Sequence, residues 1–348
     1  MYLGQMIGRI VFRDSVKLNG FHSVSIKKSV HQIVQTAKLT IPMSVLLENQ
    51  HSPALASRLF MKDVIKEGDK INISFGYRKG DIEDVKQEFT GYIRSINYKI
   101  PVEIECEDAM YLFRNTTIKQ SFNGVDIKEV LLKICVEVTK KYQVAFKLYD
   151  KMPQITVSNF IVNNQSAMWA LQQLIDWYPM LGIYLTQING EEVLYCGLVY
   201  QDLGKPNVEY GLSGPINNTI SVSELKYQTT TKTAKVVWKI TQPNGTVVTK
   251  EIGDSNAELV INKKISGKVN DDLLKQMTNQ EVSQKNYVGY NGNFTAFLYP
   301  FCDFGVVASL QDPQFPERKG NYFVGTVTTT FDTSTGGRRK PEIDFKLR

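Results

Sequence analysis

Hydrophobic and polar residues alternate over much of the first hundred or so positions. The stretch INISFGY, residues 71–77, places an apolar residue at every second position, and EFTGYIRSINY follows before Pro101 marks a tight return into VEIECED. Alternation with a period of two is typical of half-buried strands. We therefore predict a meander of short strands. One helix is expected within residues 44–64, broken at Pro53, with apolar positions at Leu46, Leu47, Leu55 and Leu59.

The period changes near residue 121. DIKEVLLKICVEVTKKYQ and SAMWALQQLIDWYPMLG carry apolar residues at helical spacing, with Asp126 and Ser166 placed to cap the two helices. GIYLTQINGEEVLYCG then predicts a β-hairpin that turns at Asn189-Gly190. The middle of the chain is therefore expected to be an α/β module.

Strand patterning resumes after the Gly- and Pro-rich stretch GKPNVEYGLSGP. It includes SVSELKYQTTTKTAKVVWKI, a hairpin around Asn244-Gly245, a polar helix at DDLLKQMTNQEVSQKN and a β-rich last sixty residues. We divide the chain into a first β domain (1–118), an α/β module (119–215) and a second β domain (216–348). The last of these carries an inserted hairpin and helix at about 241–290.

The two β ends share an order of parts. GDKINISF begins at Gly68 and GVVASLQD at Gly305, each is followed by a charged loop that ends in Lys-Gly, and then come FTGYI with Gly91 and FVGTV with Gly325. From the first glycine to the strand glycine is 91 − 68 = 23 residues in one copy and 325 − 305 = 20 in the other. Short hairpins also resemble one another by chance, but order and spacing together favour a duplication.

A glycine within a strand indicates a bulge or a sharp bend of the kind that turns a barrel corner, which is the role we expect for Gly91 and Gly325. The predicted fold class is α+β, mainly β, with two similar β-barrel tube domains and the α/β module between them. Three such chains would form a ring of six similar barrels, which suits an adaptor between rings of unequal symmetry.

These stretches resemble the baseplate or tail hub proteins of phages and related injection machines, the late control protein D family, which is related to the hub part of type VI secretion spike proteins. The resemblance rests on GDKINISF and EFTGYIRSI, on SAMWALQQLIDWYPMLGIYLTQINGEEVLYCG, and on residues 304–347. The last stretch is similar to the family's Gly-x-Tyr-x-Val-x-x-Val strand and Gly-Arg-Arg return, at Gly320, Tyr322, Val324, Val327 and Gly337-Arg338-Arg339. It departs from the family at Gly305, which Val306 follows where an aspartate is usual.

The resemblance implies a homotrimer with two barrels per chain, stacked on the tail tube or a distal tail protein, with the α/β module outside or below. Because the sequence stops at Arg348, it further implies a spike, and any cell-wall lysing domain, on separate chains. DNA would be a partner only as cargo that passes through the lumen, in a virion or injection particle assembled in the host cytoplasm.

Composition excludes several other classes. The 348 residues are 42% hydrophobic and carry a net charge of +6 that is mixed along the chain, without the basic stripe of a nucleic-acid binder. No segment predicts stable membrane insertion or a secretory signal. The cysteines are expected to be buried, and they form no motif for a metal or a cofactor: Cys106, Cys135, Cys196 and Cys302. The histidines form no motif for a metal or for catalysis: His22, His31 and His51.

Two charged stretches are candidate functional surfaces. Glu103, Glu105 and Glu107 fall on one face of a strand, which is typical of a water-facing side, of the carboxylates of a glycosidase, or of an acidic lining of the ring's lumen. Gly336-Gly337-Arg338-Arg339 predicts an exposed contact loop, or a plain solvated hairpin.

The leading interpretation is a non-enzymatic hub protein that joins the hexameric tail tube to a central spike. A tail-associated enzyme that degrades cell wall or glycan is the alternative, and a β-rich glycan-binding module is the third.

Overall fold

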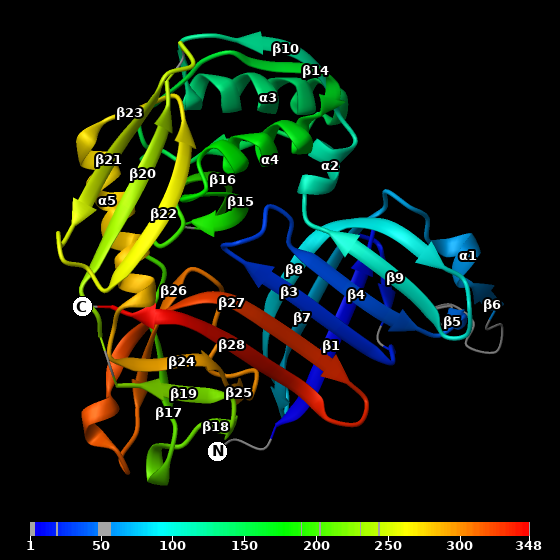
Figure 1. The fold of residues 1–348 in the computed structure, drawn as a ribbon. Coiled ribbons are helices and arrows are strands. Elements are labelled where there is room, and N and C mark those ends of the chain that lie inside the picture. Colours follow the sequence, from blue (N-terminus) through cyan, green and yellow to red (C-terminus); the bar gives the residue numbers. More distant parts are fainter. Residues whose placement is uncertain are drawn as a thin grey trace.

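The computed structural model describes residues 4–18, 20–47, 57–188, 190–201, 203–229, 231–242 and 244–347, and it is mainly β (Figure 1). The predictions at His51, Pro53, Leu55 and Asn189 fall outside these residues. The N-terminal strands and helices are β1 (Gln5–Phe12), β2 (Val16–Leu18), β3 (Ser23–Ser29), β4 (Thr36–Ile41), β5 (Ser44–Leu47), β6 (Ser57–Phe60), α1 (Met61–Val64), β7 (Lys70–Lys79), β8 (Ile82–Asn97), β9 (Val102–Glu107) and α2 (Met110–Arg114).

The middle of the chain contains the two predicted helices. Its elements are β10 (Thr117–Phe122), β11 (Val125–Asp126), α3 (Ile127–Tyr142), β12 (Lys147–Leu148), β13 (Ile155–Val157), β14 (Phe160–Ser166), α4 (Ala167–Trp177), β15 (Leu181–Ile188) and β16 (Glu191–Leu198). The Asp126 side chain accepts a hydrogen bond from the Lys128 N–H, and Ser166 accepts one from Trp169. Both predicted caps are confirmed.

The C-terminal part is again β-rich and contains the predicted polar helix. Its elements are β17 (Val208–Gly211), β18 (Thr219–Ser221), β19 (Leu225–Gln228), β20 (Ala234–Thr241), β21 (Val247–Gly253), β22 (Leu259–Ser266), β23 (Lys268–Val269), α5 (Asp271–Lys285), β24 (Gly289–Asn293), β25 (Thr295–Ala296), β26 (Val306–Gln311), β27 (Gly320–Asp332) and β28 (Gly336–Lys346). The hairpin at Asn244-Gly245 joins β20 to β21, and Gly245 has the positive φ of 83° that such a turn requires.

The helix expected within residues 44–64 is wrong at residues 44–47 and 57–60. There β5 pairs with β6 in an antiparallel arrangement, with Ser44 opposite Phe60, and among the described residues of this range only Met61–Val64 is helical. Over so few residues, the spacing of the apolar positions fits both a helix and a strand. The pairing of β5 with β6 therefore determines which of the two forms.

Fifteen strands of the described residues join in one sheet, whose main path is β18-β25-β28-β27-β3-β4-β9-β8-β7-β1-β2. β27 connects the two β ends of the chain: Val306–Leu310 of β26 pair with its first half, and Ser23–Ser29 of β3 pair with its second half. The long β27 and β28 therefore run across both regions (Figure 1). The pairings close neither region into a ring, so the two expected closed barrels are not confirmed.

The two ends nevertheless have the same local strand order. β7-β8-β9 and β26-β27-β28 are both antiparallel meanders, and Gly91 and Gly325 lie on the middle strand of each. The registers of the two hairpins differ. In the first, Gly91 lies opposite Ile71, which is three residues after Gly68. In the second, the residue next to Gly325, Val324, accepts a hydrogen bond from the N–H of Gly305 itself. The glycines thus occupy equivalent strands at positions that are offset along them.

The inserted segment packs with the α/β module. Trp238 of β20 and Leu274 of α5 lie in the same buried cluster as Leu131 of α3 and Leu174 of α4. This core is built from the middle of the chain, from the insertion, and from Ile33 and the buried residues of α2 in the N-terminal part. A second core lies beneath β26, β27 and β28, and a third between β1, β3, β4, β7, β8 and β9.

Candidate functional site: a charged junction

The acidic row on β9 is already neutralised by basic neighbours. Glu103 pairs with Lys99 at 2.8 Å and Glu105 with Lys38 at 2.9 Å. Both side chains are about half exposed. Glu103 and Glu105 therefore remain candidate residues for the lining of a water-filled lumen.

Glu107 does not share their exposure. Its side chain is 2% exposed. Its carboxylate accepts two hydrogen bonds from Arg114, at 2.7 and 2.8 Å, and forms an ion pair with Arg94 at 3.1 Å. The expectation that all three glutamates face water is therefore wrong at Glu107.

Gly336-Gly337-Arg338-Arg339 forms the beginning of β28 instead of an exposed loop, and the turn comes before it. Gly337 packs against Leu298, and Arg339 is 1% exposed. These two residues cannot form the predicted contact surface, because side chains at alternate positions of β28 point into the core. Arg338 and Gly336 are partly exposed.

Arg339 instead forms a buried ion pair with Glu88 of β8. The guanidinium binds both carboxylate oxygens, at 2.6 and 3.2 Å, and also donates to the carbonyl oxygens of Leu298 and Cys302. Burial disfavours the charged guanidinium, but Glu88 outweighs this effect and raises the pKa of Arg339. Glu88 is the extra residue of a bulge between Phe89 and Gln87 in the pairing with β7, so the strand irregularity accompanies the ion pair.

A second charged cluster lies close by, where three parts of the chain meet at Asp303. Lys28 of β3 approaches Oδ1 at 3.3 Å, and Lys205, in the connection between β16 and β17, approaches Oδ2 at 3.2 Å. Burial alone would raise the pKa of Asp303, but the two ammonium groups reverse this effect and hold the pKa well below its ordinary value. The carboxylate therefore stays charged.

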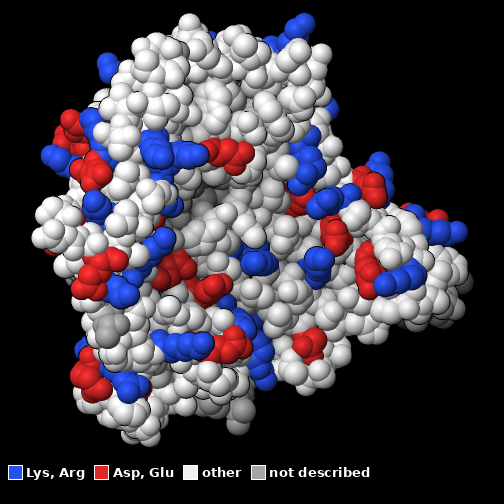
Figure 2. Space-filling model, viewed as in Figure 1, with Lys and Arg blue, Asp and Glu red and all other residues white. Residues whose placement is uncertain are grey.

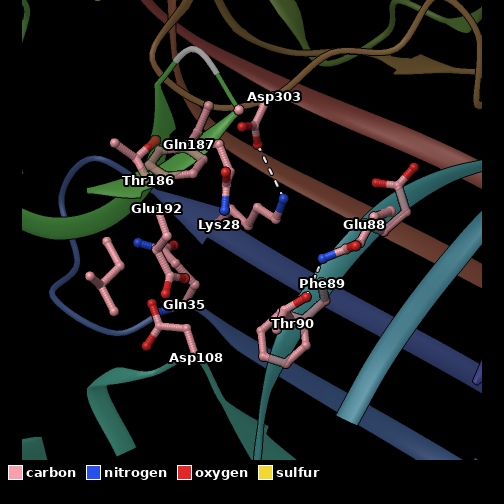
Figure 3. Close-up of a pocket in the computed structure, with 14 residues that line it drawn as sticks. Lys28, Gln35, Glu88, Phe89, Thr90, Asp108, Thr186, Gln187, Glu192 and Asp303 are labelled. Atoms are coloured by element: carbon pink, nitrogen blue, oxygen red, sulfur yellow. Dashed lines mark hydrogen bonds and ion pairs between the residues drawn. The ribbon is translucent and has the colours of Figure 1, made fainter. Parts of the chain in front are cut away.

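A cleft of about 510 Å³ opens beside this cluster, between the sheet and the β15–β16 hairpin. Figure 2 shows the hollow, with acidic and basic side chains around it. In Figure 3, Lys28 reaches toward Asp303, with Glu88, Phe89 and Thr90 on one side of the cleft and Gln35, Asp108 and Glu192 on the other. A second cleft of about 500 Å³ lies beyond Asp303 and shares Gln187 and Gly190 with the first.

The two remaining acids of the cleft have raised pKa values. Burial raises the pKa of Asp108 well above its ordinary value, and its two oxygens accept the backbone N–H groups of Gln35 and Met110, both at 3.1 Å. Burial in the hollow also raises the pKa of Glu192, and the positive charge of Lys70 opposes part of this increase. Because Asp108 holds the chain at the start of α2, its role here is structural.

The other titratable candidates are placed as follows. The four cysteines are buried as expected, and burial raises the thiol pKa of each, to about 12 at Cys135, Cys196 and Cys302. His31 approaches Asp344 at 2.7 Å through Nε2, and His22 precedes β3. In the described part of the chain, no three His, Cys, Asp or Glu side chains are grouped so that they could hold a metal ion, and no helix is long and apolar enough to cross a membrane.

Neither charged cluster was predicted from the sequence. A signal for Arg339 was present, because it shares the alternation of Pro341, Ile343 and Phe345, whose side chains are buried. Glu88 and Asp303 carry no comparable local signal.

Comparisons with known proteins identify the fold. No protein-family model matches the chain, and no curated protein matches it in sequence. Among solved structures, it is similar to a tail protein from Neisseria meningitidis MC58, with a TM-score of 0.63 and 10% identity over 97% of this chain and 96% of that one. It is also similar to the 43 kDa tail protein of prophage MuSo2 from Shewanella oneidensis, with a TM-score of 0.60 and 11% identity over 97% and 98% of the two chains.

A third similar structure is the E. coli c3393 protein, described as a component of the type VI secretion system that resembles bacteriophage T4 tail proteins. Its TM-score is 0.59 at 7% identity, over 97% of this chain and 77% of that one. At these identities the likeness shows the fold. The chain has the fold of phage tail and type VI secretion proteins, as the sequence resemblance suggested.

Proposed function

We propose that this chain is the hub protein of a phage tail or a related injection particle, with a structural role in the baseplate. The observation that carries the proposal is the similarity of fold to tail proteins, which extends over nearly the whole length of both chains. The fold of the chain as a whole, and not a single motif, is what this protein shares with them.

In the proposed assembly, three chains form a homotrimeric ring in which each contributes two similar β regions. The matching strand order of β7-β8-β9 and β26-β27-β28 supports this pseudo-sixfold arrangement. The barrel-like tube of each region is completed, in this proposal, by neighbouring chains. Such a ring matches a hexameric tail tube on one side and a threefold spike, on a separate chain, on the other.

The same proposal assigns the outer position to the α/β module and the lumen to the face that carries Glu103 and Glu105. DNA or protein cargo would pass through this lumen, because the pairing of Lys38 and Lys99 with these glutamates leaves no excess of positive charge that would hold DNA. No observation favours the glycan-degrading alternative, because the β9 glutamates are each paired with a basic side chain.

The experiment that tests the proposal is a mass measurement of the purified chain under native conditions, at several concentrations and ionic strengths. We expect an assembly of three chains. Images of the particle, with this chain tagged at its C-terminus, should then place it at the end of the tail tube. A chain that is monomeric under every condition, and that is absent from the tail in such images, would contradict the hub assignment.

A further inference from the structure

We propose that the cluster of Lys205, Asp303 and Lys28 is a latch that holds the α/β module at a fixed angle to the sheet. In this proposal the β15–β16 hairpin swings and widens the cleft when the latch is released. The latch belongs to the single chain, so it does not depend on the proposed ring.

The contacts of Lys205 give it this role. An ammonium group has three donors, and Lys205 uses them on Thr186 Oγ1 at 2.9 Å, on the carbonyl oxygen of Phe304 at 2.9 Å and on Asp303 at 3.2 Å. Thr186 belongs to β15 of the module, whereas Asp303 and Phe304 belong to the segment that leads into β26. One side chain, 9% exposed, therefore joins the two parts.

Asp303 extends the connection to the first β region. Its second oxygen binds Lys28 of β3, so β3, β15 and the segment before β26 meet through one carboxylate and two ammonium groups. Two cations share one carboxylate, so the loss of Lys205 leaves Asp303 paired with Lys28. It removes the hydrogen bonds that join Thr186 of the module to the segment before β26, and the connection between the module and the sheet is weakened at this point.

The clefts provide the space for movement. The clefts of about 510 and 500 Å³ lie on the two sides of Asp303, and Gln187 and Gly190 near the tip of the β15–β16 hairpin line both of them. The tip therefore overhangs open space on either side of the latch. Behind it, Tyr184 of β15 contacts Tyr195 and Phe304 through their rings, at centroid distances of 4.8 and 5.4 Å. These aromatic contacts form the pivot.

The test measures the distance between the module and the sheet by pulsed electron spin resonance. Spin labels are attached at Lys17→Cys on β2 and Lys128→Cys on α3, which are both exposed. The native cysteines are buried, so the labels react at the introduced sites. Labelled chains are diluted into an excess of unlabelled chains so that each assembly carries one labelled copy.

We expect one narrow distance distribution for the labelled parent protein and a resolved second population, above about a tenth of the molecules, for Lys205→Met. Lys205→Arg, which keeps the charge, should restore the narrow distribution. The matched control is Lys147→Met, since Lys147 pairs with Glu191 on the same hairpin but outside the latch, and its distribution should not change.

A folded Lys205→Met variant with the parent distribution would overturn the proposal, as would a broadening of equal size in Lys147→Met. If Lys205→Met does not fold, Asp303→Asn is measured in its place. That variant removes the carboxylate that Lys205 and Lys28 share, and it should also show the second population. Its failure to do so would overturn the latch.

Discussion

At the scale of single residues, Arg339 can be buried because the carboxylate of Glu88 meets it there. The pair with Glu88 joins β28 to β8, two strands that are not neighbours in the sheet. The guanidinium nitrogens of Arg339 further donate to backbone carbonyl oxygens and to Thr329 Oγ1. Such a pair stabilises the structure only while both members are present.

We therefore expect Arg339→Met to lower the free energy of unfolding by about 3–5 kcal/mol, because it leaves the Glu88 charge buried without a partner. The double variant Glu88→Met, Arg339→Met should recover most of the loss, since it removes both charges. Urea denaturation at equilibrium measures these differences. The control is Arg338→Met at the preceding residue, whose guanidinium donates to the carbonyl of Gly337. This variant should lower the free energy of unfolding by about 1 kcal/mol or less. A loss that is equal in the two single variants would contradict this account.

The sequence contained part of this information. The alternation in β28 places Arg339 on the buried face, but two consecutive arginines and two glycines favoured a solvated turn. Its partner is 251 residues away along the chain and sits at a bulge, so no local pattern identifies it. Lys28, Lys205 and Asp303 could not be predicted for the same reason, because the fold alone brings them together.

At the scale of elements, the sequence predicted those whose signals are local. α3, α4 and α5 have clear periodicity or polar composition, and Asp126 and Ser166 cap the first two as expected. The helix predicted within residues 44–64 was wrong at 44–47 and 57–60, because the strand pairing between β5 and β6 depends on a partner segment and not on spacing. The expected barrels likewise depended on long-range closure, and the structure has an extended sheet through β27 in their place.

The two strand glycines make a prediction that separates their roles. A β-carbon at Gly91 would collide with the backbone carbonyl of Glu107, whereas one at Gly325 would meet the carboxylate of Asp344, a side chain that can turn away. We expect Gly91→Ala to lower the free energy of unfolding by about 2–4 kcal/mol, and Gly325→Ala to lower it by about 1–2 kcal/mol.

Thermal unfolding followed by circular dichroism measures both variants. The control is Gly20→Ala, because a β-carbon there has no neighbour within 4 Å. Equal melting temperatures for Gly91→Ala and Gly20→Ala would show that the close approach on β8 does not constrain the sheet.

At the scale of the whole molecule, the continuity of the sheet bears on how the chain could serve as the proposed hub. β27 pairs with β26 at one end and with β3 at the other, so the two β regions are joined by backbone hydrogen bonds as well as by Arg339 and Glu88. They should therefore move as one body, and in the latch proposal the α/β module is the part that changes its angle. A ring of three such bodies would keep a lumen of constant width.

The position of Glu105 tests which face of the sheet lines that lumen. In the proposed ring, Glu105→Cys faces channel water, so it should react with a small maleimide but not with a maleimide linked to a polymer too large to enter the channel. The loss of its exposed pair with Lys38 should cost little stability. Ile161→Cys is the control, because Ile161 lies on the module and is 63% exposed, and it should react with both reagents. Mass spectrometry of the intact assembly counts the labels. Equal reaction of Glu105→Cys with both reagents in the trimer would place β9 on the outer surface and exclude the acidic lumen.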